Sequence, residues 1–228
     1  MTTDRRRGNR PEPLRYRTAQ EAVAGMLREK ILSGEIVPGT RLLQTDVAEQ
    51  FETSTTPVRE AMRQLIAEGL LAGDPHRGVT TYEPSLKELQ EIYEIRLLLE
   101  PLSIAATVGN ISEDDLAYAE ELMIQMEGES DPGSWTVINA EFHRTLIEAA
   151  GRPRIAAIIH SLRAISTIYV AASIHEVPGR MDLGNKEHRE LIEACRAGDI
   201  AGAQDIERKH LEHTLELGRR AIIRFEAT

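Results

Sequence analysis

The stretch ETSTTPVREAMRQLIAEGL, residues 52–70, decides how the N-terminal part of the chain folds. Pro57 is tolerated in the first turn of a helix, where the backbone N–H groups have no intrahelical acceptor. Ser54 or a neighbouring threonine can cap those N–H groups. The apolar residues then recur at helical spacing, on one face: Val58, Ala61, Met62, Leu65 and Ile66. We therefore predict an amphipathic helix with a polar, preorganised N-terminal end.

A second face of this helix carries hydroxyl and guanidinium groups. Thr56, Arg59 and Arg63 share it at spacings of three and four. The positive end of the helix dipole adds to this donor-rich surface. Such a surface suits phosphate groups and guanine edges in a major groove. Taken alone, the helix pattern is better explained as an ordinary amphipathic helix with a solvated polar face.

The flanking sequence favours the DNA-binding interpretation of this helix. A helical pattern runs from Thr18 to Gly34, and a Pro-Gly turn follows at residues 38–39. Thr45 can cap a short helix, and a break near residues 52–53 gives the order of a helix-turn-helix. Residues 72–84 predict a small β-hairpin, or wing. Its tip holds His76, Arg77 and Gly78, where glycine lets the backbone approach a phosphate or the minor-groove edge.

Composition and charge narrow the class of protein. Cys195 is the single cysteine, so no disulfide forms within the chain, which fits a reducing cytoplasmic setting. No apolar run approaches the roughly 18 residues needed to span a bilayer, and we expect no membrane partner. Residues 1–82 carry 12 Lys and Arg against 11 Asp and Glu, a net charge of +1; residues 83–228 carry 15 against 26, a net of −11. The N-terminal third is therefore the part that can approach a polyanion.

The chain is expected to divide into three parts. Residues 1–17 form a basic arm, which is either a solvated tail or a contact to phosphates. Residues 18–82 form the helix-turn-helix unit with its wing, and residues 83–228 form an all-helical domain. Helices in the last part are expected to begin at Ser85, Ser112 and Asp131, which resemble helix caps. The predicted fold is mainly α, with a C-terminal antiparallel helical bundle.

Histidines recur on the inward faces of three predicted helices. Asn139 and His143 lie one turn apart on a face with Trp135 and Phe142. His188 faces inward with Leu191, and the last helix turns His210 and His213 inward. A single inward histidine is usually a core residue, but three on separate helices favour convergence. Imidazoles so placed are good ligands for zinc, nickel or another borderline divalent metal.

Two arginines are candidates for binding an effector. Arg96 shares an inward face with Ile92 and Glu100, and a buried arginine needs a partner. It is either a structural ion pair, for example with Glu100, or a bidentate clamp for an effector carboxylate. Arg163 is a weaker candidate of the same kind.

Four motifs occur in order: PGTRL, DVAEQF, STTPVREAMRQLIAEGLL and PHRG. Together they resemble the winged helix-turn-helix domain of the GntR family of bacterial transcription regulators, over residues 18–82. The acidic remainder is similar to the FadR-type ligand-binding domain of that family. The resemblance implies a homodimer that binds a pseudo-palindromic double-stranded operator and releases it when a small molecule binds. It also implies one metal held at four positions, here Asn139, His143, His188 and His210.

Several positions depart from the family pattern. Thr45 and Thr55 stand where arginine is common, and Glu52 stands where the turn often has glycine. Threonine still bonds a phosphate or a base, but it lacks the charge and the bidentate fork of arginine. Asn139 replaces the usual aspartate and offers only a neutral oxygen to a metal.

These observations favour a repressor released by a small organic acid, with no catalytic chemistry of its own. Two alternatives stay open: a regulator for which the metal itself is the signal, and a metal-dependent enzyme. No H-E-x-x-H motif or nucleophile–base pair supports the enzyme.

Overall fold

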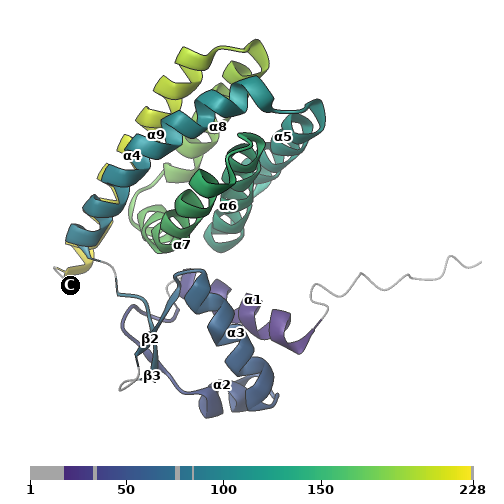
Figure 1. Cartoon of the computed structure of the whole chain (residues 1–228). Coiled ribbons are helices and arrows are strands. Elements are labelled where there is room, and N and C mark those ends of the chain that lie inside the picture. The colour runs from purple at the N-terminus through teal and green to yellow at the C-terminus, as the bar shows by residue number, and fades with distance from the viewer. Residues whose placement is uncertain (1–17, 33–34, 75–77, 84, 227–228) are drawn as a thin grey trace, which may run out of the picture.

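The computed structural model describes residues 18–32, 35–74, 78–83 and 85–226. Across these residues, nine helices and three strands form a small N-terminal part and a larger helical part (Figure 1). The predicted arm, residues 1–17, lies outside the described residues, as do His76 and Arg77 at the tip of the wing.

The N-terminal part is built around α3, Thr55–Ala67. Its predicted apolar face packs against α1 (Ala19–Leu32) and α2 (Gln44–Gln50) and buries Val58, Ala61, Met62 and Leu65. Ile66 was expected on the same face, but it is 37% exposed. It lies at the edge of the helix, beside Gly73 of the wing.

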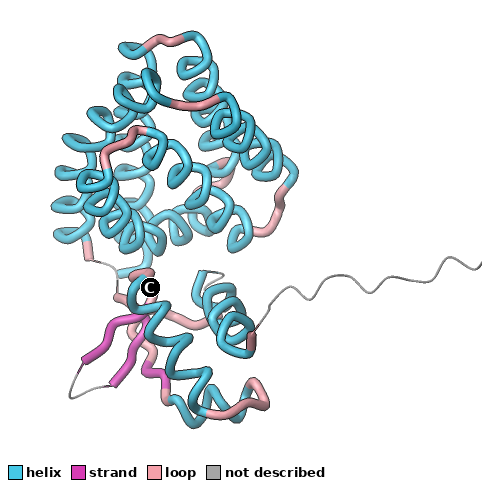
Figure 2. Tube along the Cα trace, turned by 45° about the vertical axis from the view of Figure 1, so that its right-hand side comes forward, coloured by secondary structure: helices cyan, strands magenta, loops and turns pink. Residues whose placement is uncertain are grey.

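The wing is a three-stranded antiparallel sheet (Figure 2). The predicted hairpin is present as β2 (Leu71–Asp74) and β3 (Gly78–Thr81), which pair in register from Leu71 with Thr81 to Asp74 with Gly78. The third strand, β1 (Arg41–Leu42), pairs with the other edge of β3. The sequence did not predict β1, because a strand of two residues has no periodicity.

The turn between α2 and α3 requires an unusual backbone conformation. Glu52 has φ of 49°, and no other described non-glycine residue has positive φ. This left-handed conformation costs an ordinary residue about 1 kcal/mol, because its Cβ crowds the backbone. Glycine, which is common at this position in the family that the sequence resembles, would adopt this conformation without that cost.

The predicted helix caps are confirmed only in part. Ser112 and Asp131 accept hydrogen bonds from the amides of Asp115 and Ser134. Ser54 and Ser85 occupy N-cap positions, but neither side chain accepts a cap hydrogen bond. Thr45 is not a cap: α2 begins one residue earlier, after Leu43, and the Thr45 hydroxyl donates to Asp46 instead.

The helical part is the predicted antiparallel bundle. Its helices are α4 (Leu86–Asn110), α5 (Glu113–Gly128), α6 (Pro132–Ala149), α7 (Pro153–Glu176), α8 (Arg180–Ala197) and α9 (Ile200–Glu226). The long helices α4 and α9 run antiparallel and side by side (Figure 1). Trp135 and Phe142 of α6 are fully buried, as the helical spacing predicted.

Helix α7 corrects the expectation about apolar segments. Over Pro153–Ile174 it is long and apolar enough to cross a membrane by length and composition alone, with a mean hydropathy of 1.6. One such helix is weak support for a membrane span, since core helices of soluble proteins pass the same test. Here α7 packs against α4, α6 and α9 and buries Ile159 and Tyr169.

The two parts are in direct contact. The backbone changes from sheet to helix between Thr81 and Leu86, where the predicted boundary lies. Helix α1 of the N-terminal part packs against α6 and α7 of the helical part. Gly69, after α3, has φ of 74°, and a Cβ there would lie 2.9 Å from the backbone of Ile165. Glycine therefore permits both the turn and the close approach of the N-terminal part to α7.

Candidate functional site

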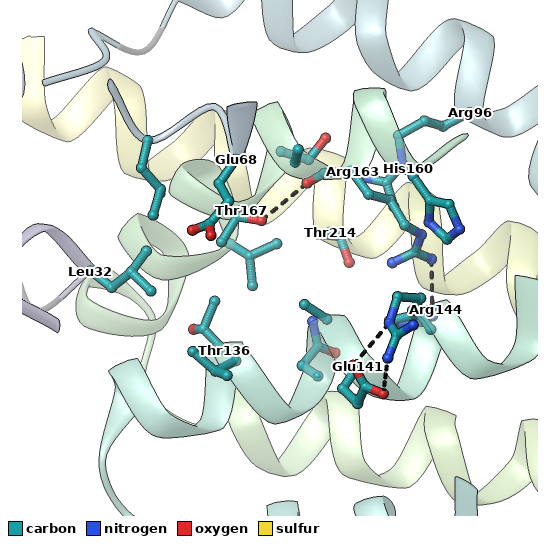
Figure 3. A pocket seen from close by; sticks show the side chains of 18 of the residues that line it. Leu32, Glu68, Arg96, Thr136, Glu141, Arg144, His160, Arg163, Thr167 and Thr214 are labelled. Atoms are coloured by element: carbon teal, nitrogen blue, oxygen red, sulfur yellow. Dashed lines mark hydrogen bonds and ion pairs between the residues drawn. The ribbon is translucent and has the colours of Figure 1, made fainter. Parts of the chain in front are cut away.

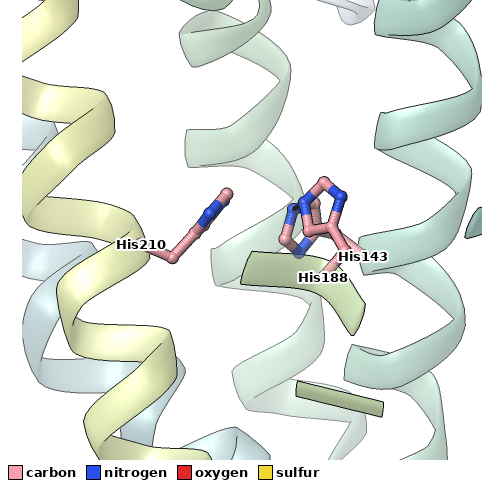
Figure 4. Close-up of side chains that lie close together, drawn as sticks. All are labelled: His143, His188 and His210. Atoms are coloured by element: carbon pink, nitrogen blue, oxygen red, sulfur yellow. Dashed lines mark hydrogen bonds between the residues drawn. The ribbon is translucent and has the colours of Figure 1, made fainter. Parts of the chain in front are cut away.

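Three histidines from three helices meet inside the bundle (Figure 4). His143 comes from α6, His188 from α8 and His210 from α9, and all three are buried. One ring nitrogen from each lies within 4.8 Å of the others. Nε2 of His143 and Nε2 of His188 are 3.2 Å apart. The predicted convergence of the histidines is therefore present.

Burial keeps these imidazoles neutral at neutral pH. It lowers the pKa of His143 and of His188 well below the usual value, and the positive charge of Arg163 acts in the same direction on both. The pKa of His210 is also lowered by burial, although Glu187 opposes the shift. Neutral imidazole is the protonation state in which histidine binds a metal.

Glu187 orients the third histidine. One carboxylate oxygen accepts from Nδ1 of His210 at 2.7 Å, and the other accepts from Nδ1 of His213 at 2.5 Å. With its proton on Nδ1, His210 keeps the lone pair on Nε2. A carboxylate behind a histidine is a common support in metal sites. His213 was expected to face inward, but its side chain is half exposed.

Asn139 is the fourth residue of the predicted metal site. It lies one turn before His143 on α6 and is 8% exposed. Its Oδ1 accepts no hydrogen bond from any residue that the structure describes. A buried carbonyl oxygen usually has a partner, because desolvation is otherwise uncompensated. Three neutral imidazoles and an orphan amide oxygen fit a borderline divalent metal.

The two predicted effector arginines share one carboxylate. Arg96 donates from Nε to Glu100 at 2.6 Å and lies over the Tyr93 ring, which is the ion pair expected as the alternative role. Arg163 donates from Nε to the other oxygen of Glu100 at 2.9 Å. It also donates from Nη2 to Nδ1 of His143 at 2.9 Å. Both arginines therefore have an ion partner within the protein, and their predicted role as a clamp stays a prediction.

A cavity of about 540 Å³ opens beside the histidines (Figure 3). His143, His210, Asn139, Arg96 and Arg163 line its inner wall, with hydroxyls from α6, α7 and α9. Its outer wall includes residues of the N-terminal part: Arg28, Leu32, Glu68 and Leu70. The volume is typical of sites for small molecules.

The N-terminal end of α3 faces solvent. Ser54, Thr55, Thr56, Arg59 and Arg63 are exposed, and so is Thr45 on α2. The two arginines pair with Glu60, at 3.5 Å from Nε of Arg59 and 3.0 Å from Nη1 of Arg63. Exposed pairs of this kind contribute little and exchange readily for another anion. The predicted DNA-facing residues on the helices are therefore accessible together.

The wing adds one residue that the sequence analysis did not select. Gly78 begins β3 with φ of 83°, and a Cβ added there would lie 3.9 Å from the guanidinium group of Arg41. Arg41 is exposed on β1, so it places a cation beside Gly78, next to the tip of the wing. Its position was hidden because β1 was not predicted. Glu187 was also missed, although its place immediately before His188 was a usable signal.

Comparisons with known proteins agree with this architecture. Residues 19–80 match the gntR family of bacterial regulatory proteins, and residues 91–213 match the FCD domain. The chain is 27% identical over 206 residues to the uncharacterized HTH-type transcriptional regulator YdhC of Bacillus subtilis, covering 85% of this chain and 91% of the relative. It is 28% identical over 189 residues to a probable D-xylose utilization operon transcriptional repressor of Paenarthrobacter nicotinovorans, covering 80% and 83%.

A solved structure supports the fold. The structure of McbR of Escherichia coli matches with a TM-score of 0.71 at 24% identity, over 90% of this chain and 99% of that chain. A helix-turn-helix part with a wing and a helical domain thus occur together in that solved structure. The chain belongs to the GntR family of bacterial regulatory proteins, carries an FCD domain as its helical part, and is a DNA-binding regulator rather than an enzyme.

Proposed function

We propose that this protein is a cytoplasmic repressor that binds operator DNA through residues 18–82 and releases it when a small organic acid binds within residues 83–228. The observation that carries the proposal is the position of the cavity. Its inner wall includes His143 and His210, and its outer wall includes Arg28 and Glu68 of the DNA-binding part. A molecule large enough to span the cavity would contact both parts at once.

The DNA contacts of this proposal come from α3 and the wing. Thr55 and Thr56 offer hydroxyls at the positive end of the helix dipole, and Arg59 and Arg63 offer cations that lie on its exposed face. Arginine at such positions contacts guanine or phosphate in the major groove. Ser54, Thr45 and the wing residues His76, Arg77 and Gly78 extend the contact surface to the backbone.

A homodimer is part of the same proposal. Ile95, Leu98 and Leu102 form an exposed apolar stripe on α4, and Leu98 is 74% exposed. A second copy packed on this stripe would bury it while leaving α3 free and would match a pseudo-palindromic operator. Leu98→Glu is expected to give monomers in light scattering and weak operator binding. Ile124→Glu on α5, where the side chain is 62% exposed, is the matched control and should stay dimeric. An unchanged Leu98→Glu dimer would place the interface elsewhere.

The proposed cofactor is a divalent metal, zinc or nickel. His143, His188, His210 and Asn139 would hold it, and it would supply a Lewis-acidic centre for a carboxylate of the effector. Arg163 now donates to Nδ1 of His143, so that nitrogen accepts and the proton lies on Nε2. A metal held by His143 would therefore compete with this hydrogen bond from Arg163.

The test combines DNA binding with effector binding. Operator duplexes are selected from fragments of the source genome, and fluorescence anisotropy then follows binding as acids are added. His143→Ala should bind operator DNA like the wild type and lose the response to the acid. A full response in this variant would refute the effector site. A wild type that selects no sequence from the genome would refute the repressor.

The histidine cluster also supports a second function, in which the metal is the signal. Three neutral imidazoles can bind a metal with moderate affinity in the absence of an organic acid. Titrating zinc or nickel into the protein–operator complex, with and without acids, separates the two functions. Release by metal alone would favour the sensor, and release that needs an acid would favour the effector site.

A further inference from the structure

Arg180 is a buried cation that the sequence analysis did not select. It is the first residue of α8, is 2% exposed, and lines the cavity beside His210 and Thr214. Its Nη2 donates to the Thr214 hydroxyl at 2.9 Å. Its Nε and Nη1 donate to no residue within the described ranges. The guanidinium group therefore keeps unused donors inside the protein.

No described carboxylate neutralises Arg180. Glu187 acts on it electrostatically, but both Glu187 oxygens already accept hydrogen bonds from His210 and His213. Burial lowers the pKa of Arg180, and Glu187 only partly offsets this. Arg96 and Arg163, in contrast, both pair with Glu100. A buried cation without an ion partner among the described side chains is costly, so its presence beside a cavity points to an anionic ligand.

The surrounding helices leave space for the guanidinium group. Gly184 lies one turn after Arg180 on α8, and a Cβ there would meet Nη1 of Arg180 at 3.1 Å and the Trp135 ring at 3.2 Å. Glycine inside a helix costs stability relative to alanine. At this position it gives the guanidinium group and the indole ring room to pack against the helix.

We propose that Arg180 is the anion-binding residue of the cavity and holds a carboxylate of the ligand. Nη2 carries two hydrogens and gives one to Thr214. The other can act together with an N–H of Nη1 or of Nε, which is the bidentate geometry that a carboxylate accepts. The regulatory consequence rests on the function proposed above, whereas the binding itself is independent of DNA.

The test measures binding of D-gluconate, citrate and acetate by calorimetry, with and without zinc. Arg180→Met is expected to weaken binding of at least one acid by about 10- to 100-fold, the usual effect of removing hydrogen bonds to a buried charge. Arg180→Lys keeps the charge without the fork and should lie between. Arg144→Met is the matched control, because Arg144 also lines the cavity but already pairs with Glu141 and Glu148. Its affinity should change by less than about threefold.

A stability measurement separates binding from a structural role. Without acid, Arg180→Met should melt at or above the wild-type temperature, because an unpaired buried charge is removed. Equal acid affinity in wild type and both Arg180 variants would overturn the inference. Failure of the wild type to bind any of the three acids would overturn it as well.

Measuring operator release distinguishes the Arg180 inference from the proposed repressor mechanism. If acids bind through Arg180 but leave the operator complex intact, the inference stands and the repressor mechanism fails. If acids release the operator equally from wild type and Arg180→Met, the mechanism stands and the inference fails.

Discussion

Asn139→Asp is expected to tighten divalent-metal binding by about 10- to 100-fold. The substitution keeps the shape of the side chain and places a carboxylate where the orphan Oδ1 lies, one turn before His143. At an effective dielectric constant of about 20, a unit charge 4 Å from another gains about 4 kcal/mol, and a divalent ion doubles this. Desolvating the carboxylate costs several kcal/mol of that gain. A remainder of roughly 1.4–2.8 kcal/mol corresponds to the stated range.

The metal-free variant should show the opposite effect. A carboxylate buried without a metal is uncompensated, so the free energy of unfolding is expected to fall by about 1–3 kcal/mol. Competition titration against a zinc chelator gives the affinity, and thermal denaturation with and without chelator gives the stability. The metal-induced rise in melting temperature should therefore be larger in Asn139→Asp than in the wild type.

Asn185→Asp is the control for this experiment. Asn185 is also 8% exposed, but its Oδ1 already accepts from the Trp135 indole at 2.9 Å. Its replacement should destabilise the protein without a comparable gain in metal affinity. Unchanged or weaker metal binding by Asn139→Asp would refute Asn139 as a ligand. Equal gains in both variants would show that charge alone, rather than position, is responsible.

Three further changes test other features. Glu52→Gly should raise the free energy of unfolding by up to about 1 kcal/mol, because glycine accepts φ of 49° without strain, whereas Glu49→Gly within α2 should lower it by a similar amount in thermal denaturation. Deleting residues 1–16 removes five arginines and should weaken operator binding and flatten its salt dependence; an unchanged slope of affinity against salt would exclude the arm from the contact. Burial and the nearby carboxylate of Glu100 raise the pKa of Glu207 to about 8 from 4.5, so the folded form retains a proton that the unfolded chain loses. The free energy of unfolding of the wild type should therefore fall relative to that of Glu207→Gln as the pH rises from about 4.5 to 8, by up to ~1.4 kcal/mol per pH unit. Denaturant titrations at several pH values measure this difference. Parallel pH profiles of the two proteins would contradict the shifted pKa.

The sequence predicted the elements whose signals are local. The period of Val58, Ala61, Met62 and Leu65 identified α3, and Ser112 and Asp131 marked helix starts that the structure confirms. The two-residue strand β1 was beyond such signals, because its existence depends on pairing with β3. Caps failed at Ser54 and Ser85, where the residue type was right but the hydroxyl makes no cap bond.

The site was predictable where it depends on helical faces. One inward histidine on each of three helices was sufficient to expect the cluster of His143, His188 and His210. The partners of the arginines were not predictable in the same way, because they depend on distances between helices. Arg163 meets Glu100 and Glu207 from other helices, and Arg180 has no ion partner among the side chains that the structure describes. Charge pairing across helices is a property of packing, which sequence spacing does not contain.

The position of the cavity constrains how a ligand can alter DNA binding. A ligand shifts an equilibrium between two arrangements only by the difference in its affinity for them. Arg28 and Glu68 form a bidentate ion pair, at 2.9 and 2.7 Å, on the outer wall of the cavity, and Gly69 beside them meets the backbone of α7. The affinity of a ligand that is held at the histidines and also reaches this ion pair would depend on the position of the DNA-binding part. A smaller acid that contacts only the inner wall has no such contact and must act through the position of α7. Ligands of increasing length should therefore differ in operator release more than they differ in affinity for the free protein, and equal release at equal occupancy would show that the outer wall is not used.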